Sequence, residues 1–241
     1  MFYIEIAELL VQVNNRWEAL HTHCQPYLCS ATREPDLVME VDDEGITWSQ
    51  QYFRVHEHRE ISPEEAELSR ATYTIFPQLP QFDAFWLHAA VIQMGDACYG
   101  LTAPSGYGKT TNARLWLQAY PHQARIINGD NPIIRRKGET FFAYGTPFCG
   151  KEGYQVNTGV PLKGFCYLQH GEENAIRRMD KAVAFAQLLR EYQNQFWPQY
   201  REKYIQLLQD FAETVPIYVL TCNRQVEAAR VAYEGMKHGG N

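Results

Sequence analysis

Residues 1–60 alternate between apolar and polar positions in short runs. The period-two patterns predict strands over residues 2–13, 37–41 and 46–55, with a turn at residues 42–45, where Asp-Asp-Glu-Gly interrupts the pattern. From Ser62 on, serine followed by proline and two glutamates is typical of a helix start. We therefore expect a strand-rich N-terminal part that leads into a helix.

From residue 85 on, the pattern changes to longer apolar runs. Residues 85–94 and 97–103 are predicted to form two strands joined by a turn at Gly95-Asp96, and residues 110–120 an amphipathic helix. The apolar residues at the i, i+3, i+4 and i+7 positions of this helix are Ala113, Trp116, Leu117 and Tyr120. Pro121 then ends the helix, because proline cannot continue the hydrogen-bond pattern.

The remaining segments continue the alternation of strands and helices. The further predicted strands are residues 124–127, a hairpin over 132–144 that turns at 137–138, residues 162–168 and residues 216–222; the further predicted helices are residues 181–194, 198–213 and 225–237. This order indicates an α/β fold whose sheet has mixed strand directions. We expect two parts, residues 1–84 and residues 85–241, packed on the same core.

Composition excludes several classes of protein. The chain has 241 residues, of which 45% are hydrophobic and 21% charged, so it is not disordered. Its formal net charge of −6 gives no support to nucleic-acid binding. No apolar run approaches the ~18 residues of a membrane span, and the first residues carry glutamates where a secretory signal would be basic. We expect a cytoplasmic protein with neither nucleic-acid nor membrane partners.

The six cysteines are scattered along the chain, and free thiols are expected for a cytoplasmic protein. His21, His23, Cys24 and Cys29 lie close together in the sequence and raise the question of a zinc site. Their Cys-x4-Cys spacing is loose and no second pair of ligands is evident, so ordinary core or loop residues are the favoured interpretation.

The stretch Ala-Pro-Ser-Gly-Tyr-Gly-Lys-Thr lies between the predicted strand 97–103 and the predicted helix 110–120. It fits the phosphate-binding (Walker A) pattern, in which small residues let backbone N–H groups surround phosphate oxygens at a helix start. In that pattern Lys109 reaches the β- and γ-phosphates of ATP and Thr110 binds Mg²⁺. The predicted nucleotide-binding residues are Ala103, Pro104, Ser105, Gly106, Tyr107, Gly108, Lys109, Thr110 and Thr111. A plain strand-to-helix turn is the alternative.

A phosphate-binding loop needs an acidic partner, and Asp130 is the candidate. It follows a short apolar run twenty residues after Thr110. A carboxylate there would hold Mg²⁺ or accept the proton of an attacking hydroxyl. The sequence does not separate these two roles. The alternative is an ordinary turn, because Asn-Gly-Asp-Asn is rich in turn-forming residues.

Over residues 85–170 the chain resembles two related families, HPr kinase/phosphorylase and phosphoenolpyruvate carboxykinase. The resemblance rests on His88-Ala-Ala-Val, on Lys109-Thr110, on Gly129-Asp130 and on the segment 143–154, Ala-Tyr-Gly-Thr-Pro-Phe-Cys-Gly-Lys-Glu-Gly-Tyr. It implies a mixed-sheet P-loop domain of the type found in these families, with the N-terminal part outside the match. These families carry an Asp-Asp pair where this chain has Gly129-Asp130, and the HPr kinases assemble into rings, which implies a possible homo-oligomer.

The same resemblance places His88 beside the γ-phosphate, although by spacing alone a histidine at the start of an apolar strand is more often a core residue. Lys151 would stabilise the transferred phosphoryl group or an anionic acceptor, or it is simply a solvated loop lysine. Cys149 has no partner base and is treated as a lining residue. The expected catalytic set is thus Lys109, Asp130, His88 and Lys151.

The leading hypothesis is an ATP-dependent kinase that phosphorylates a hydroxyl, either a serine of a protein or peptide or a small metabolite. Gly129 in place of a first acid favours an alternative, a non-catalytic nucleotide-binding regulatory module. A third hypothesis is the reverse reaction, a phosphorylase or phosphatase.

Overall fold

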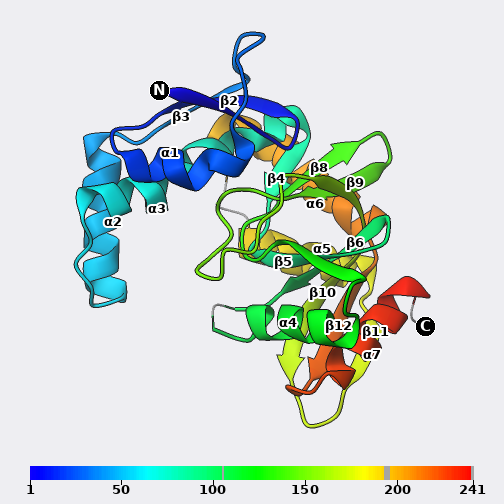
Figure 1. The fold of residues 1–241 in the computed structure, drawn as a ribbon. Coiled ribbons are helices and arrows are strands. Elements are labelled where there is room, and N and C mark those ends of the chain that lie inside the picture. The colour runs from blue at the N-terminus through cyan, green and yellow to red at the C-terminus, as the bar shows by residue number, and fades with distance from the viewer. Residues whose placement is uncertain (105, 193–195, 240–241) are drawn as a thin grey trace.

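The computed structural model describes residues 1–104, 106–192 and 196–239 (Figure 1). The N-terminal part contains a three-stranded sheet in the order β1-β2-β3, in which β1 and β2 form an antiparallel hairpin and β3 runs parallel to β2. Its elements are β1 (Phe2–Ile6), β2 (Leu9–Asn14), α1 (Glu18–Cys24), β3 (Leu37–Glu40), α2 (Asp43–His56) and α3 (Pro63–Ile75). Helix α3 begins where the sequence predicts, with the Ser62 side chain accepting a hydrogen bond from the Glu65 N–H.

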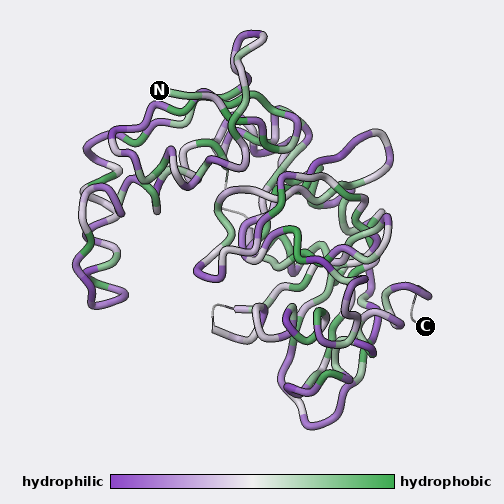
Figure 2. Tube along the Cα trace, in the orientation of Figure 1, coloured by the Kyte–Doolittle hydropathy of each residue, from purple (hydrophilic) through white to green (hydrophobic). Residues whose placement is uncertain are grey.

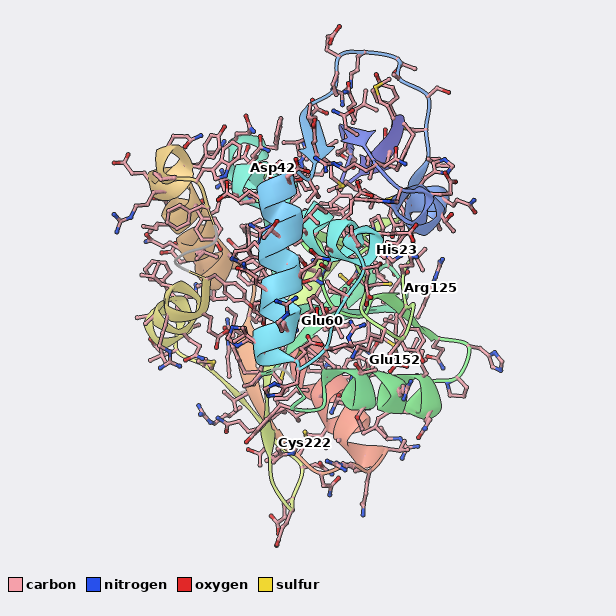
Figure 3. All side chains as sticks on the ribbon, turned by 90° about the vertical axis from the view of Figure 1, so that its left-hand side faces the viewer. His23, Asp42, Glu60, Arg125, Glu152 and Cys222 are labelled. Carbon is pink, nitrogen blue, oxygen red and sulfur yellow. The ribbon has the colours of Figure 1, made fainter. Side chains whose placement is uncertain are left out.

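Helix α2 corrects the expectation of a strand over residues 46–55, so the N-terminal part is less strand-rich than predicted. The Asp42 side chain accepts a hydrogen bond from the Gly45 N–H, so the predicted turn at 42–45 is the first turn of this helix. The segment satisfies both periods: Ile46 and Ser49 are buried at helical spacing. The β-favouring aromatic residues Trp48 and Tyr52 are exposed, and Phe53 is half-buried against the N-terminal core. Figure 3 shows α2 in front, with Asp42 at its start and Glu60 beside its lower half.

The larger sheet has nine strands and mixed directions, which confirms the expected α/β fold. The order along it is β4-β8-β9-β10-β6-β5-β7; β12 pairs with β10, and β11 pairs with β12. Strands β6, β10 and β12 are parallel, and their neighbours β5, β9 and β11 run antiparallel to them. The strands are β4 (Ala84–Trp86), β5 (Ala89–Met94), β6 (Ala97–Thr102), β7 (Ala124–Asn128), β8 (Ile133–Lys137), β9 (Thr140–Tyr144), β10 (Gly159–His170), β11 (Ala175–Arg178) and β12 (Ile217–Cys222).

Four helices cover the two faces of this sheet. Helices α4 (Lys109–Ala119) and α7 (Glu227–Lys237) share one hydrophobic core with the sheet, and α5 (Lys181–Tyr192) and α6 (Arg201–Thr214) share another. Figure 2 shows hydrophobic segments both in the N-terminal part and in the region of the large sheet. The end of the predicted helix 181–194 lies outside the described residues, and β11 was not predicted. No helix in the described ranges has the length and apolar character needed to cross a bilayer.

One long antiparallel ladder runs through two pairs of strands and is interrupted where the candidate site lies. Strand β4 pairs with β8 and β5 pairs with β7, and one register joins the two pairs: the Leu87 N–H donates to Pro132 O, and the Ala89 N–H to Asp130 O. Pro132 has no N–H to donate, so the ladder is broken beside it. His88 and Asp130 both lie at this break, His88 between β4 and β5 and Asp130 between β7 and β8.

The N-terminal part packs against this ladder. Its hydrophobic core includes Ala84, Trp86 and Ile133 of the large sheet. Arg135 on β8 donates a hydrogen bond of 2.6 Å to the carbonyl oxygen of Ala7. The contact places α2 and α3 beside the break in the ladder.

Candidate functional site

The loop between β6 and α4 has a backbone that requires glycine. Gly106 and Gly108 have φ angles of 76° and 98°, in the region that other residues rarely adopt. The Tyr107 N–H donates to Pro104 O at 3.0 Å, which closes a tight turn, and Gly108 is the N-cap of α4. The first N–H groups of a helix have no partner within the helix, and here they open on this loop. Ser105, also assigned to the loop by sequence, lies outside the described residues.

Lys109 is the first residue of α4 and is almost fully buried, with 7% of its surface exposed. Its Nζ lies 2.8 Å from His88 Nε2 and 3.4 Å from the carbonyl oxygen of Ala103. Burial lowers the pKa of Lys109, although the charge of Asp130 acts in the opposite direction. The lysine side chain therefore reaches back under its own loop towards the broken ladder.

His88 joins the lysine to the aspartate. Its Nε2 lies 3.0 Å from Asp130 Oδ1 as well as 2.8 Å from Lys109 Nζ. An ammonium only donates and a carboxylate only accepts, so the tautomer of His88 decides which of the two it bonds. The ammonium of Lys109 and the carboxylate of Asp130 therefore compete for the same imidazole nitrogen.

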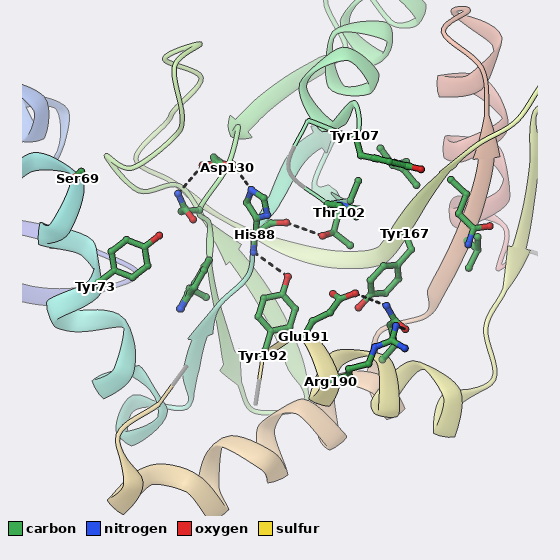
Figure 4. A pocket seen from close by; sticks show the side chains of 18 of the residues that line it. Ser69, Tyr73, His88, Thr102, Tyr107, Asp130, Tyr167, Arg190, Glu191 and Tyr192 are labelled. Atoms are coloured by element: carbon green, nitrogen blue, oxygen red, sulfur yellow. Dashed lines mark hydrogen bonds and ion pairs between the residues drawn. The ribbon is translucent and has the colours of Figure 1, made fainter. Parts of the chain in front are cut away.

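The backbone of His88 is fixed on both sides (Figure 4). Its N–H donates to Tyr192 Oη at 3.3 Å, and its carbonyl oxygen accepts a hydrogen bond of 2.8 Å from Thr102 Oγ1. Tyr192 is the last residue of α5, and Thr102 is the last residue of β6. The backbone that carries the imidazole is thus held by α5 and by β6, the strand that leads into the loop.

Asp130 sits in a turn that Asn128 organises. The buried Asn128 Oδ1 accepts hydrogen bonds from the N–H groups of Asp130 and Asn131, at 2.9 and 2.8 Å. Asn128 Nδ2 donates to the backbone oxygen of Thr146, whose hydroxyl donates to Asn131 O. The Tyr-Gly-Thr-Pro segment found in the sequence therefore buttresses the turn that carries the candidate acid.

The carboxylate of Asp130 is held in its ionised form. Burial raises its pKa, but the hydrogen bond and charge of His88 and the charge of Lys109 outweigh burial, so the pKa lies below its usual value. Its second oxygen, Oδ2, accepts a hydrogen bond of 3.0 Å from Asn131 Nδ2. At neutral pH this group is an anionic hydrogen-bond acceptor.

The glycine in front of Asp130 has a steric cause. A Cβ on Gly129 would lie 2.8 Å from the carbonyl oxygen of Cys149, a distance that real Cβ atoms do not adopt. The segment that follows Thr146 thus fills the space where a second carboxylate would stand. The site contains one aspartate at this turn for structural reasons.

A cavity of about 1230 Å³ opens beside these groups. His88, Asp130, Asn131 and the loop residue Tyr107 line its centre, and α5 and β11 form its floor. The opposite wall comes from the N-terminal part and consists of Trp48, Ser49, Tyr52, Phe53 and Glu57 of α2 and its end, with Ser69 and Tyr73 of α3. We call Trp48, Tyr52 and Tyr73 the aromatic wall. The cavity exceeds the usual size of a site for one small ligand.

The structure brings together three of the four residues expected to be catalytic, namely His88, Lys109 and Asp130. Lys151 is not among them: it is exposed in the turn over residues 150–153 and makes no ion pair or hydrogen bond with any described residue. Its neighbour Gly150 does pack on the Asp130 side chain, and a Cβ there would lie 3.2 Å from Asp130 Cβ. Of the two threonines, Thr110 is half-buried in the first turn of α4 and Thr111 is exposed.

Sequence reasoning missed the residues that hold this centre in place. Asn128 could have been found, because an asparagine two residues before an aspartate commonly bonds the following N–H groups. Tyr192 and Thr102 carry no such signal, because they reach His88 only through the fold. Among the described residues, no group of three His, Cys, Asp or Glu side chains with metal-site geometry occurs.

No protein-family model matches the chain, and no curated protein matches it. Among solved structures, the chain is similar to the Hpr(Ser) kinase/phosphatase from Coxiella burnetii, with 9% sequence identity and a TM-score of 0.40, over 64% of this chain and 99% of that one. The likeness to that kinase/phosphatase is a distant one.

Proposed function

We propose that the protein is an ATP-dependent phosphotransferase that moves the γ-phosphate to a hydroxyl group. The observation that carries the proposal is the convergence of Lys109, His88 and Asp130 beside the cavity, next to a glycine-dependent loop that leads into the start of a helix. Phosphoryl transfer needs positioning and charge neutralisation more than covalent chemistry, and a buried cation beside an ionised carboxylate supplies both.

In this proposal the loop over residues 103–111 holds the phosphates with its backbone N–H groups and with the partial positive charge of α4. Lys109 leaves His88 and the carbonyl of Ala103 and turns to the β- and γ-phosphates. A phosphate beside Lys109 Nζ adds negative charge, which stabilises the buried ammonium and returns its pKa towards the usual value.

Asp130 then serves the acceptor. The release of Lys109 leaves His88 free to donate from Nε2 to Asp130 Oδ1, while Asn131 continues to hold Oδ2. The carboxylate stays ionised at neutral pH and accepts the hydrogen bond, and finally the proton, of the attacking hydroxyl. The aromatic wall faces this reaction point across the cavity, so the acceptor is expected between α3 and Asp130.

The residues also suit Mg²⁺, which is bound in proteins through one or two oxygen ligands together with substrate phosphates. Asp130 and the hydroxyl of Thr110 offer ligands of this kind, and neither is a sulfur or imidazole donor. Mg²⁺ neutralises charge on the transferred phosphate when it is bound.

Lys109→Ala tests the phosphate site. We expect titration calorimetry with Mg²⁺ and ATP to show binding by the unmodified protein and a loss of affinity of roughly a hundredfold in the variant, since a buried charge-assisted contact to phosphate is removed. Lys151→Ala is the matched control, because Lys151 is exposed and makes no contact with the centre. Equal affinity of the Lys109 variant and the unmodified protein for Mg²⁺-ATP would contradict the proposal.

One observation favours a second function, a nucleotide-binding module without catalysis. The carbonyl of Cys149 closes the space beside Gly129, which leaves one carboxylate at the turn. A single carboxylate must then serve both the metal and the acceptor hydroxyl. The two functions differ in the fate of the γ-phosphate, which such a module would bind without transferring.

A further inference from the structure

Two aromatic surfaces lie near the proposed nucleotide-binding loop. One is the aromatic wall, in which Trp48 and Tyr52 stack with ring centroids 5.3 Å apart. The other is the pair of Tyr107, on the loop, and His170, at the end of β10, with ring centroids 4.4 Å apart. Both surfaces offer exposed rings on which a nucleobase could stack, so the structure must decide between them.

The Tyr107–His170 pair borders a shallow groove on the α4 side of the loop. Gly108, Thr111, Asn112, Cys222, Asn223 and Arg224 are among its other lining residues. The groove encloses only about 20 Å³, so a base would stack on its rim rather than enter it. Arg224 is exposed and forms no ion pair within the described part of the chain, which leaves its guanidinium free for an anionic ligand.

The two amide side chains of the groove, Asn112 and Asn223, are already hydrogen-bonded within the protein. Asn112 donates to Cys222 Sγ and accepts from Trp116 Nε1, and Asn223 bonds Glu172 O and the Gln225 N–H. These bonds fix the walls of the groove and occupy the groups that could read a base edge. The groove can therefore bind a nucleotide through ring stacking and through charge.

The geometry of α4 gives the direction of a bound nucleotide. Successive residues of an α-helix are turned by about 100°, so Lys109 and Thr111 point to nearly opposite sides. The Lys109 side chain reaches His88 at the large cavity, and Thr111 lines the groove. A phosphate chain that crosses the start of α4 with its γ end at Lys109 and Asp130 thus has its other end at Thr111 and Arg224.

We infer that the nucleoside of ATP binds in this groove, with its base stacked on the Tyr107–His170 pair and its α-phosphate near Arg224. The inference rests on the proposed function, because it takes the γ end to lie at Asp130. It leaves the aromatic wall to the acceptor. Tyr107 lines both the groove and the large cavity, which places it at the boundary between the two substrates.

Two probes separate the base from the phosphates: ATP and inorganic tripolyphosphate, each titrated with Mg²⁺ by calorimetry. We expect Tyr107→Ala and His170→Ala each to weaken ATP binding roughly tenfold, as the loss of a base–aromatic stack does, and to leave tripolyphosphate binding unchanged. Tyr52→Ala, on the aromatic wall, is the matched control and should leave the affinity for both ligands unchanged.

The outcomes distinguish this inference from the function on which it rests. If Tyr52→Ala weakens ATP binding and His170→Ala does not, the base stacks on the aromatic wall and the inference is overturned. It is also overturned if His170→Ala weakens the binding of ATP and of tripolyphosphate equally, or leaves the binding of both unchanged. If the unmodified protein binds neither probe, the proposed phosphate site itself fails and the groove fails with it.

Discussion

Asp130→Asn is expected to slow phosphate transfer by about 10²- to 10⁴-fold, the range attributed to a positioned general base, while nucleotide binding persists. Asparagine keeps the shape of the side chain and its contact with Asn131, but it cannot accept the proton of the attacking hydroxyl. Asparagine has one acceptor oxygen in place of two, so it cannot accept from both His88 and Asn131, and the pairing with the charge of Lys109 is lost with the negative charge. Initial rates of label transfer or of slow ATP hydrolysis, measured beside ATP affinity, give the two effects separately.

Asp96→Asn is the matched control for this variant. Asp96 is an exposed carboxylate in the turn between β5 and β6 and contacts none of the groups of the centre. The control should keep both rate and affinity. Full turnover in the Asp130 variant would remove the aspartate from the chemistry and leave it a structural role.

Trp86→Ala is expected to lower the free energy of unfolding by about 3–5 kcal/mol, the usual cost of truncating a large buried aromatic residue. Trp86 lies on β4 and stacks on Phe76 with ring centroids 4.9 Å apart. It also makes edge contacts with Tyr73 of α3 and Tyr192 of α5. The side chain thus joins the N-terminal part, the large sheet and the residue that fixes His88. Urea or thermal unfolding measures the change.

Trp197→Ala is the matched control for the loss of an indole ring. Trp197 is 41% exposed and stacks on Tyr200 alone among the described aromatic residues. Its removal should change the free energy of unfolding by less than about 1 kcal/mol. Equal losses in the two variants would mean that Trp86 does not join the two parts of the chain in the way described.

The centre of the domain was predictable because its signals are local. The hairpin over residues 132–144 and the strand–loop–helix unit around Lys109 follow from apolar periods, glycines and a terminating proline, all within a few residues of one another. The glycines at 106 and 108 indicate a tight loop in the sequence, and in the structure both adopt the positive φ that such a loop requires.

The remaining features depend on contacts that no local pattern encodes. Helix α2 has a sequence that suits a strand as well as a helix, and the Asp42 cap together with packing on α3 decides between them. Tyr192 reaches His88 across 104 residues of sequence. The aromatic wall could not be predicted from the sequence, because it forms only when Trp48 and Tyr52 of α2 and Tyr73 of α3 come to face the same cavity.

The fate of the γ-phosphate tests the central claim most directly. The protein is incubated with Mg²⁺ and γ-labelled ATP, with and without a panel of serine peptides and small hydroxyl compounds, beside the Lys109→Ala variant. We expect the unmodified protein to transfer the label to a hydroxyl or to release it by slow hydrolysis, and the variant to do neither. ATP that stays bound and intact in every mixture would contradict it and identify a nucleotide-binding module.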